Sequence, residues 1–154
     1  EKFTTFVPDE VMRIAFLEEK VRYDVAADLD IQEDMPEIRA DQALVAQLFR
    51  NLISNSFKYR DESRKLHIGL TSSKKGGQLA FRYTDNGVGI KPENLGKVFE
   101  VFYSTAGAER DGSGVGLTIV KRIVESHGGL IKVESEPDRG TEFIFTLPAS
   151  EARG

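Results

Sequence analysis

The 154-residue chain contains no cysteine and no apolar run long enough to cross a membrane. Without cysteine it has neither a disulfide framework nor a thiolate metal site, which suits a reducing compartment. Its first residues do not resemble a signal peptide, and the missing initiator methionine indicates a fragment of a longer protein. We therefore expect a cytoplasmic domain that does not contact a membrane directly, whether or not its parent protein is membrane-anchored.

The chain also lacks an excess of basic residues. Lysine and arginine number 21 against 25 aspartates and glutamates, which gives a net charge of −4 and a pI near 5.3. Nucleic acids and anionic membranes are bound through clustered lysine and arginine, so we expect neither as a partner. The length favours one domain, which we assign to residues 1–149, followed by a polar tail over 150–154.

Hydrophobic periodicity predicts three main helices, over residues 8–19, from an N-capping Asp41 to Tyr59, and over 117–127 with Gly128 as a C-terminal stop. The apolar faces expected on them are, in order, Val11, Ile14, Ala15 and Leu17 or Glu18; then Val45, Leu48, Phe49, Leu52, Ile53 and Phe57; then Leu117, Val120, Ile123 and Val124. A short fourth helix is expected to begin at Pro92.

Alternation of apolar and polar residues predicts the strands. They are expected at 21–25, around Ile38, and at 65–73, 78–84, 130–135 and 141–148. The acidic segment that ends at Pro36 is interpreted as a connection. The sum is a two-layer α/β sandwich, in which the three helices pack on one face of a largely antiparallel sheet.

Three glycines, Gly112, Gly114 and Gly116, alternate directly before the third predicted helix. Glycine lets a ligand approach the backbone closely, and the start of a helix offers free N–H groups, so the arrangement suits phosphate. A flexible loop would explain the glycines equally well. A P-loop is excluded because Leu117 follows the last glycine, and no strand precedes the loop as in kinase and dinucleotide-binding loops.

Asn51, Asn55 and Lys58 stand at positions i, i+4 and i+7 of the second predicted helix, so they form a polar stripe beside its apolar face. Asparagine is a poor residue for a helix interior, and a solvated edge or a buried polar contact would explain one of them. The pair together with Lys58 favours function, since an amide oxygen can ligate Mg²⁺ and an ammonium can meet phosphate.

The segment DNGVGI, residues 85–90, has the composition of a hairpin turn, but the residues after it begin a helix instead of a returning strand. The carboxylate of Asp85 is then available to accept a hydrogen bond from an exocyclic amine such as that of adenine. The two histidines, His67 and His127, have no third ligand patterned nearby, and we interpret them as structural or surface residues.

Five stretches now stand in a fixed order: NLISNSFKY, DNGVGI, VFEVFY, GSGVGLTIVKRIVESHGG and GTEFIFTLP. Together they resemble the catalytic and ATP-binding domain of sensor histidine kinases, within the gyrase, Hsp90, histidine kinase and MutL superfamily. The resemblance covers nearly the whole chain and implies a Bergerat fold, with about five strands in a mixed sheet. It also implies transfer of the γ-phosphoryl group of ATP to a histidine on a separate dimerisation domain, for relay to the receiver domain of a response regulator.

The resemblance assigns the site residues as well. It implies that Asn55 ligates Mg²⁺, that Asn51 and Lys58 lie near the phosphates, and that Tyr59 lies against the adenine. Asp85 would hydrogen-bond the adenine. The residues expected to line the rest of the nucleotide pocket are Gly87, Gly89, Ile90 and Thr141. The GSGVGL motif, formed by Gly112, Ser113, Gly114, Val115, Gly116 and Leu117, would follow a lid over residues 104–111 and meet the phosphates.

The chain departs from the family pattern at two positions. Many relatives carry arginine where this chain has Ser104, so Lys58 and Arg110 are expected to meet the γ-phosphate instead. Ser56 replaces a common alanine, a change expected to be tolerated because both side chains are small. Because Asn51 occupies the place of the water-activating glutamate of the hydrolysing relatives, a clamp ATPase is disfavoured. An anti-sigma serine kinase and a non-catalytic nucleotide-sensing or docking module stay open as alternatives.

Overall fold

The computed structural model of the chain describes residues 2–100 and 116–150. The lid expected over 104–111 lies outside these ranges, and so do five of the expected site residues. Those five are Arg110, Gly112, Ser113, Gly114 and Val115.

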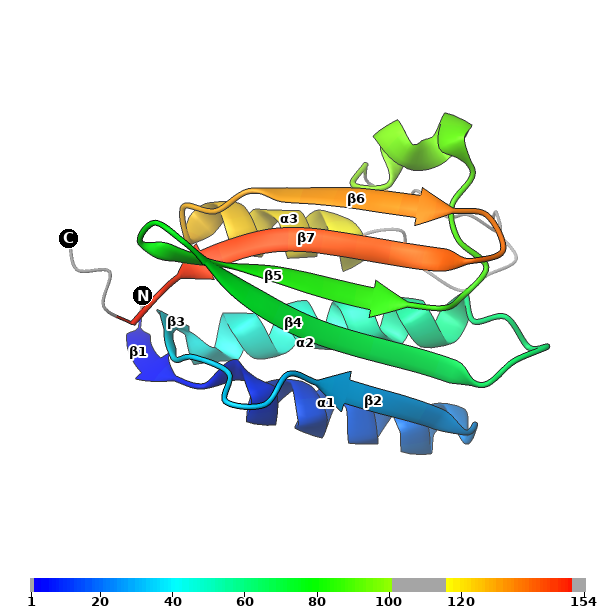
Figure 1. Ribbon diagram of the computed structural model, residues 1–154, viewed down its shortest axis with the longest axis horizontal. Helices are drawn as coiled ribbons and strands as arrows, with labels where there is room; N and C mark the ends of the chain where they lie inside the picture. The colour runs from blue at the N-terminus through cyan, green and yellow to red at the C-terminus, as the bar shows by residue number, and fades with distance from the viewer. Residues whose placement is uncertain (1, 101–115, 151–154) are drawn as a thin grey trace.

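The described residues form two layers, a five-stranded sheet and three α-helices that cover one of its faces (Figure 1). In spatial order the strands are β2 (Ala27–Ile31), β4 (Leu66–Lys75), β5 (Gln78–Asp85), β7 (Gly140–Pro148) and β6 (Ile131–Glu136). Only β2 and β4 pair in parallel, and the other neighbours are antiparallel. The predicted sandwich with a largely antiparallel sheet is confirmed.

The helical layer contains α1 (Pro8–Tyr23), α2 (Gln42–Lys58) and α3 (Gly116–Ser126). A short 3-10 helix, η1 (Pro92–Lys97), begins at the predicted proline. A separate two-stranded sheet pairs β1 (Phe3–Phe6) with β3 (Ile38–Asp41). None of the helices within residues 2–100 and 116–150 has the length and apolarity of a membrane span.

The face of α2 that packs on the sheet forms the centre of the core. All six apolar residues predicted for this face are fully buried. Among them, the Phe49 ring lies 6.3 Å from the Phe145 ring of β7, which in turn stacks on Phe81 of β5 at 5.4 Å. Full burial of one large apolar side chain contributes about 1.5–3 kcal/mol. This packing fixes α2, which carries Ser56, against β5 and β7, which carry Asp85 and Thr141.

The start of α2 is fixed by the predicted cap and by a histidine from another element. Oδ1 of Asp41 accepts hydrogen bonds from the backbone N–H groups of Ala43 and Leu44, at 3.1 and 3.3 Å. The N–H of Asp41 donates to Nε2 of His127 at 3.1 Å, so Nδ1 carries the proton and donates to the carbonyl of Ile123 at 2.8 Å. The interpretation of His127 as a structural residue is consistent with these contacts.

Two predictions near the N-terminus are wrong. The strand expected at 21–25 does not form, because α1 continues to Tyr23 and ends at Asp24 in the left-handed conformation (φ 55°). The next strand is β2, inside the segment interpreted as an acidic connection. The expected apolar face of α1 is also rotated, since Ile14 and Leu17 are 55% and 58% exposed. The buried face consists of Pro8, Met12, Ala15, Phe16 and Glu19.

Candidate functional site

Asp85 is the last residue of β5, where the DNGVGI loop begins, and it pairs in register with Thr141 of β7. Its Oδ1 accepts a hydrogen bond from the backbone N–H of Gly87 at 3.0 Å. Its Oδ2 accepts one from the hydroxyl of Ser56 at 2.6 Å. A carboxylate offers roughly four acceptor positions, so Asp85 can accept a further hydrogen bond from a ligand.

A chain of hydroxyl groups reaches Asp85 from the core. The hydroxyl of Ser56 in α2 lies 2.7 Å from that of Tyr83, and both residues are buried. Serine has one hydroxyl proton, which it donates to the Asp85 carboxylate, so Tyr83 is the donor to Ser56. Neither the contact between Ser56 and Asp85 nor a role for Tyr83 was expected from the sequence. The available signal was a serine on the otherwise apolar face of α2, because a buried hydroxyl requires a partner.

The surroundings change the pKa values of Asp85 and Tyr83, the two residues at the ends of this hydrogen-bonded series. Burial raises the pKa of the Asp85 carboxyl, and the hydrogen bonds from Ser56, Gly87 and the backbone of Thr141 oppose that rise. Burial raises the pKa of Tyr83 well above its ordinary value, and the nearby charge of Asp85 adds to the effect. Tyr83 therefore stays protonated at neutral pH. Shifts of this kind are frequent at functional sites.

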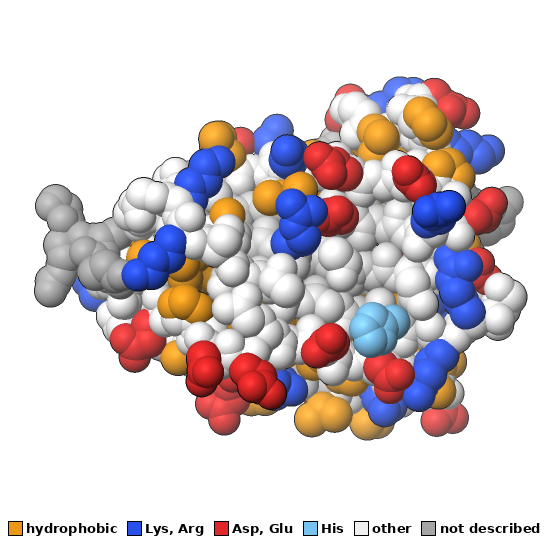
Figure 2. Space-filling view, viewed as in Figure 1, with side chains coloured by type: hydrophobic (Ala, Val, Ile, Leu, Met, Phe, Trp, Pro, Cys, Tyr) orange, Lys and Arg blue, Asp and Glu red, His pale blue; other side chains and the backbone are white. Residues whose placement is uncertain are grey.

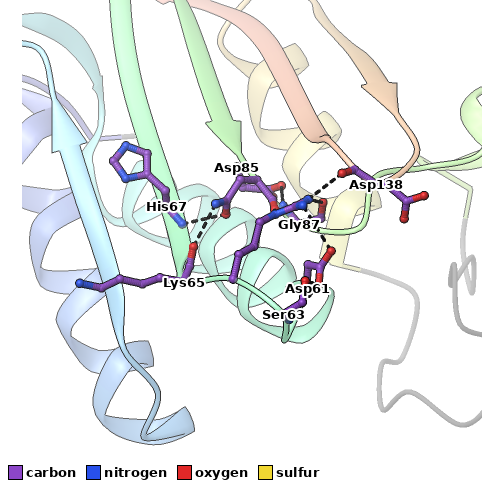
Figure 3. A network of polar contacts seen from close by, with 9 residues as sticks. Asp61, Ser63, Lys65, His67, Asp85, Gly87 and Asp138 are labelled. Carbon is purple, nitrogen blue, oxygen red and sulfur yellow. Dashed lines mark hydrogen bonds and ion pairs between the residues drawn. The ribbon is translucent and has the colours of Figure 1, made fainter.

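The DNGVGI loop is attached on one side to the start of β4 and to the segment before it (Figure 3). Asn86 Oδ1 accepts a hydrogen bond from the N–H of His67 at 2.8 Å, and Asn86 Nδ2 donates to the carbonyl of Lys65 at 2.9 Å. The N–H of Val88 donates to the carbonyl of Tyr59 at 3.0 Å. Tyr59, expected near the adenine, therefore contacts the loop through its backbone.

On its other side, the loop is attached through Ser135 of β6. The Ser135 hydroxyl accepts a hydrogen bond from the N–H of Ile90 at 2.7 Å and donates to the carbonyl of Gly140 at 2.6 Å. It also lies 3.1 Å from the hydroxyl of Thr141. Ile90 and Thr141, both expected in the nucleotide pocket, are thus connected by a residue that the sequence analysis missed.

Two glycines near Asp85 are required by close backbone packing. Gly89 has a φ of +79°, and a Cβ there would overlap the carbonyl of Glu136. Gly140 has a φ of +137°, and a Cβ there would overlap the carbonyl of Asp85 itself. L-residues other than glycine rarely adopt such angles. Glycine at these positions therefore lets the end of β6 pack on the DNGVGI loop and lets the start of β7 pack on the backbone of Asp85.

The polar stripe of α2 lies beside the start of α3. Nδ2 of Asn51 donates to the carbonyl of Gly116 at 3.3 Å, which joins the two helices. Asn51, Asn55 and Lys58 are all half-buried. Leu117 is also half-buried and packs on the core. Ser56, which contacts the Asp85 carboxylate, belongs to the same helix as this stripe.

Asp85 and Thr141 also line a shallow hollow of about 380 Å³ across the ends of β5, β6 and β7. Its other charged lining residues are Glu134, Glu136, Glu142 and Arg139. Carboxylates in excess repel phosphate, so this hollow is unsuited to a triphosphate. Figure 2 shows that acidic and basic side chains are interspersed over the open face of the sheet.

The donor groups of α2 fit a Mg²⁺ that arrives with a phosphate ligand. Within residues 2–100 and 116–150, no three histidine, cysteine, aspartate or glutamate side chains gather to hold a metal. Mg²⁺ prefers hard oxygen donors, keeps several waters and takes phosphate oxygens as ligands. One amide oxygen, such as that of Asn55, is therefore a sufficient protein contribution.

Comparison with known proteins identifies the class to which this fold and site belong. Residues 40–151 match the family described as "Histidine kinase-, DNA gyrase B-, and HSP90-like ATPase". The chain is 41% identical over 120 residues to the methanogenesis regulatory histidine kinase FilI of Methanothrix harundinacea, which covers 78% of this chain. It is 34% identical over 147 residues to the sensor-like histidine kinase SenX3 of Mycobacterium tuberculosis, which covers 92%. The chain therefore belongs to this ATPase family, as the motifs predicted.

The solved structures that it resembles include a sensor histidine kinase. The mycobacterial kinase MprB matches 96% of this chain and 98% of its own, at 25% identity and a TM-score of 0.78. Full-length ShkA in complex with AMPPNP matches 99% of this chain at 26% identity and a TM-score of 0.80, and the match covers 32% of ShkA. The chain spans only 13% of the length of FilI and 35% of that of SenX3.

Proposed function

We propose that this domain binds Mg-ATP and supplies its γ-phosphoryl group to a histidine on a separate dimerisation domain of the parent protein. The observation that carries the proposal is the Asp85 carboxylate, which Ser56 and Gly87 orient at the end of β5 beside Thr141. An oriented, partly buried acceptor of this kind distinguishes an amine-bearing base from one that carries only acceptors.

The two ends of ATP fit different parts of this region. The exocyclic amine of adenine would donate to Asp85, with Ile90 and Thr141 beside the base. The triphosphate would lie along the stripe of Asn51, Asn55 and Lys58, next to the start of α3, where free N–H groups and the helix dipole favour an anion. This arrangement keeps the phosphates away from the acidic hollow across β6 and β7.

Mg²⁺ would be held by Asn55 and by the phosphates, and when bound it neutralises phosphate charge during transfer. The part played by this chain is to bind and orient the nucleotide. Asn51 and Lys58 would hold the phosphates, and Arg110 and the glycines of the GSGVGL motif are proposed to complete the site. Phosphoryl transfer depends mainly on such positioning and charge neutralisation.

The phosphate acceptor must lie outside this domain. The ring nitrogens of His127 are occupied by Asp41 and Ile123 in a buried position. His67 lies in β4, and its sequence surroundings do not resemble those of an acceptor histidine. We propose that the acceptor is on the dimerisation domain, that an aspartate of a response regulator receives the phosphoryl group next, and that both steps occur in the cytoplasm, where ATP is available.

Two measurements test the proposal. Calorimetric titration should show micromolar binding of Mg-ADP, and Asp85→Asn should weaken it because the carboxylate acceptor is lost. With γ-labelled ATP, the isolated domain should gain no acid-labile label, whereas the parent's dimerisation domain added in trans should gain it. Acid-stable label on a protein serine would instead indicate a serine kinase, and nucleotide binding without any transfer would indicate a sensing module.

A further inference from the structure

Arg64, in the segment between α2 and β4, joins three parts of the molecule that are far apart in the sequence. Its Nε donates to the carbonyl of Asn86 at 2.8 Å. Its Nη2 donates to the carbonyls of Gly87 and Asp138, at 3.0 and 2.8 Å. The guanidinium therefore connects its own segment, the DNGVGI loop and the turn between β6 and β7. Figure 3 shows that Asp61, Gly87 and Asp138, which come from these three parts, lie close together.

One peptide unit joins Arg64 to the carboxylate of Asp85. The carbonyl of Asn86 and the N–H of Gly87 belong to the same planar peptide group. The carbonyl accepts from Nε of Arg64, and the N–H donates to Oδ1 of Asp85. A cation at the carbonyl polarises the peptide and strengthens its N–H as a donor. Arg64 thus acts on Asp85 without touching it.

The guanidinium is itself held in place. Its Nη1 lies 3.4 Å from Oδ2 of Asp61. The other oxygen of Asp61 accepts hydrogen bonds from the hydroxyl and the backbone N–H of Ser63, at 2.6 and 2.9 Å. These hydrogen bonds and then the charge of Arg64 hold the pKa of Asp61 below its ordinary value, so Asp61 stays ionised. Lysine cannot replace such a fork of donors, because its ammonium is a single point charge.

We propose that Arg64 is a positioning residue for base recognition. By fixing the peptide group between Asn86 and Gly87, it orients the Asp85 carboxylate toward the exocyclic amine of adenine and so sets the preference for that base. This inference rests on the proposed function. The family resemblance assigned nothing to Arg64, and its carbonyl partners give no signal in the sequence.

The DNGVGI loop has other attachments, so a variant at Arg64 can be tested in a folded domain. Asn86 is bound through its side chain to His67 and Lys65, and the N–H of Val88 is bound to Tyr59. These contacts do not involve the guanidinium. Arg64→Ala should therefore keep the fold while the peptide group beside Asp85 loses its cationic partner.

The experiment compares the affinities for Mg-ADP and Mg-IDP by titration calorimetry. IDP carries an oxygen in place of the amine, so the ratio of the two affinities measures recognition of the amine at Asp85. We expect Arg64→Ala to reduce the preference for ADP about five- to tenfold, the size of one ordinary hydrogen bond. Arg64→Lys should lose part of the preference.

Arg60→Ala is the matched control. Arg60 lies in the same segment, donates to the carbonyl of Phe57 at 2.8 Å and lies 3.5 Å from Glu62, with no contact to Asn86 or Gly87 among the described residues. Arg60→Ala should leave the preference for ADP unchanged, with a loss of melting temperature comparable to that of Arg64→Ala. In an Asp85→Asn background, where the carboxylate that Arg64 is proposed to orient is absent, Arg64→Ala should not change the ratio further.

The outcomes separate the inference from the function on which it rests. If the wild type binds neither nucleotide, or binds both equally, the assignment of Asp85 fails and the inference fails with it. If the wild type prefers ADP but Arg64→Ala weakens both nucleotides equally, Arg64 is merely structural and the inference is overturned. An equal loss of preference in Arg60→Ala, or a further loss in the Asp85→Asn background, would also overturn it.

Discussion

The hydroxyl of Ser56 lies 2.6 Å from Oδ2 of Asp85. Ser56 occupies the position at which the family pattern commonly has alanine. The same hydroxyl accepts from Tyr83, so it relays a hydrogen bond from the core to the site. Ser56 is therefore more than a tolerated small residue. Its hydrogen bond offsets part of the free-energy cost of burying the Asp85 carboxylate, so its contribution to nucleotide binding can be measured.

Ser56→Ala should weaken Mg-ADP binding by about tenfold, because Asp85 loses a charge-assisted hydrogen bond of about 1.5 kcal/mol and its orientation with it. Titration calorimetry measures the change. Ser54→Ala is the control, since Ser54 is half-buried in the same helix and, within residues 2–100 and 116–150, makes no hydrogen bond to Asp85. Unchanged affinity in Ser56→Ala would show that Gly87 alone is sufficient to orient the carboxylate.

The raised pKa of Asp85 predicts a pH dependence of nucleotide affinity. The carboxylate must be ionised to accept the adenine amine, so affinity is full above its pKa in the folded protein and falls as the pH drops through it. Because burial raises this pKa, the loss should begin above the ordinary aspartate range, near 4. Ser56→Ala removes a contact that lowers the pKa, so the loss should begin at a still higher pH.

The titration of the nucleotide itself is the same for both proteins, so the difference between their pH profiles isolates Asp85. Titrations of wild type and Ser56→Ala from pH 7.5 down to pH 5 provide the comparison. Coincident profiles would contradict the assignment of Ser56 as the group that lowers the pKa of Asp85.

Gly89→Ala should destabilise the domain, since a Cβ would overlap the carbonyl of Glu136 and the residue would be held at a φ of +79°. We expect a loss of roughly 1–3 kcal/mol in the free energy of unfolding, measured by urea denaturation. Gly96→Ala in η1 is the control, because a Cβ there meets nothing within 4 Å and φ is not positive. Equal losses in both variants would contradict the close-packing explanation.

The elements that could be predicted from the sequence are those with a strong hydrophobic period. In α2, all six predicted apolar residues are buried, and its predicted N-cap Asp41 accepts two backbone hydrogen bonds. In α1, apolar residues occur on both sides, so the period did not identify the buried face, and the helix continued through residues assigned to a strand. The strand β2 was missed because Asp28 and Asp30 gave its segment an acidic composition, although they alternate with Ala27, Leu29 and Ile31.

Around Asp85, too, only part of the site could be predicted from the sequence. The motif located the carboxylate, because a loop sequence of this kind is local. The groups that orient it come from distant parts of the chain: Ser56 from α2 and Ser135 from β6. Arg64 contacts the DNGVGI loop only through backbone carbonyls, which every residue has, so no residue type in the loop indicates the contact. Such partners become visible only when the fold brings the segments together.

The variant His127→Phe distinguishes two roles for His127. A structural residue would affect stability alone, whereas a phosphate acceptor would affect phosphoryl transfer. His127→Phe can keep the stacking on Phe3, whose ring lies 4.8 Å away, but it leaves the N–H of Asp41 without its partner. We expect a loss of about 1–3 kcal/mol in the free energy of unfolding, from one unsatisfied buried group. At a temperature where the variant is folded, ADP affinity and transfer of label to the dimerisation domain should match the wild type. Loss of transfer with unchanged ADP affinity would instead identify His127 as part of the phosphoryl path, because a purely structural residue would affect stability alone.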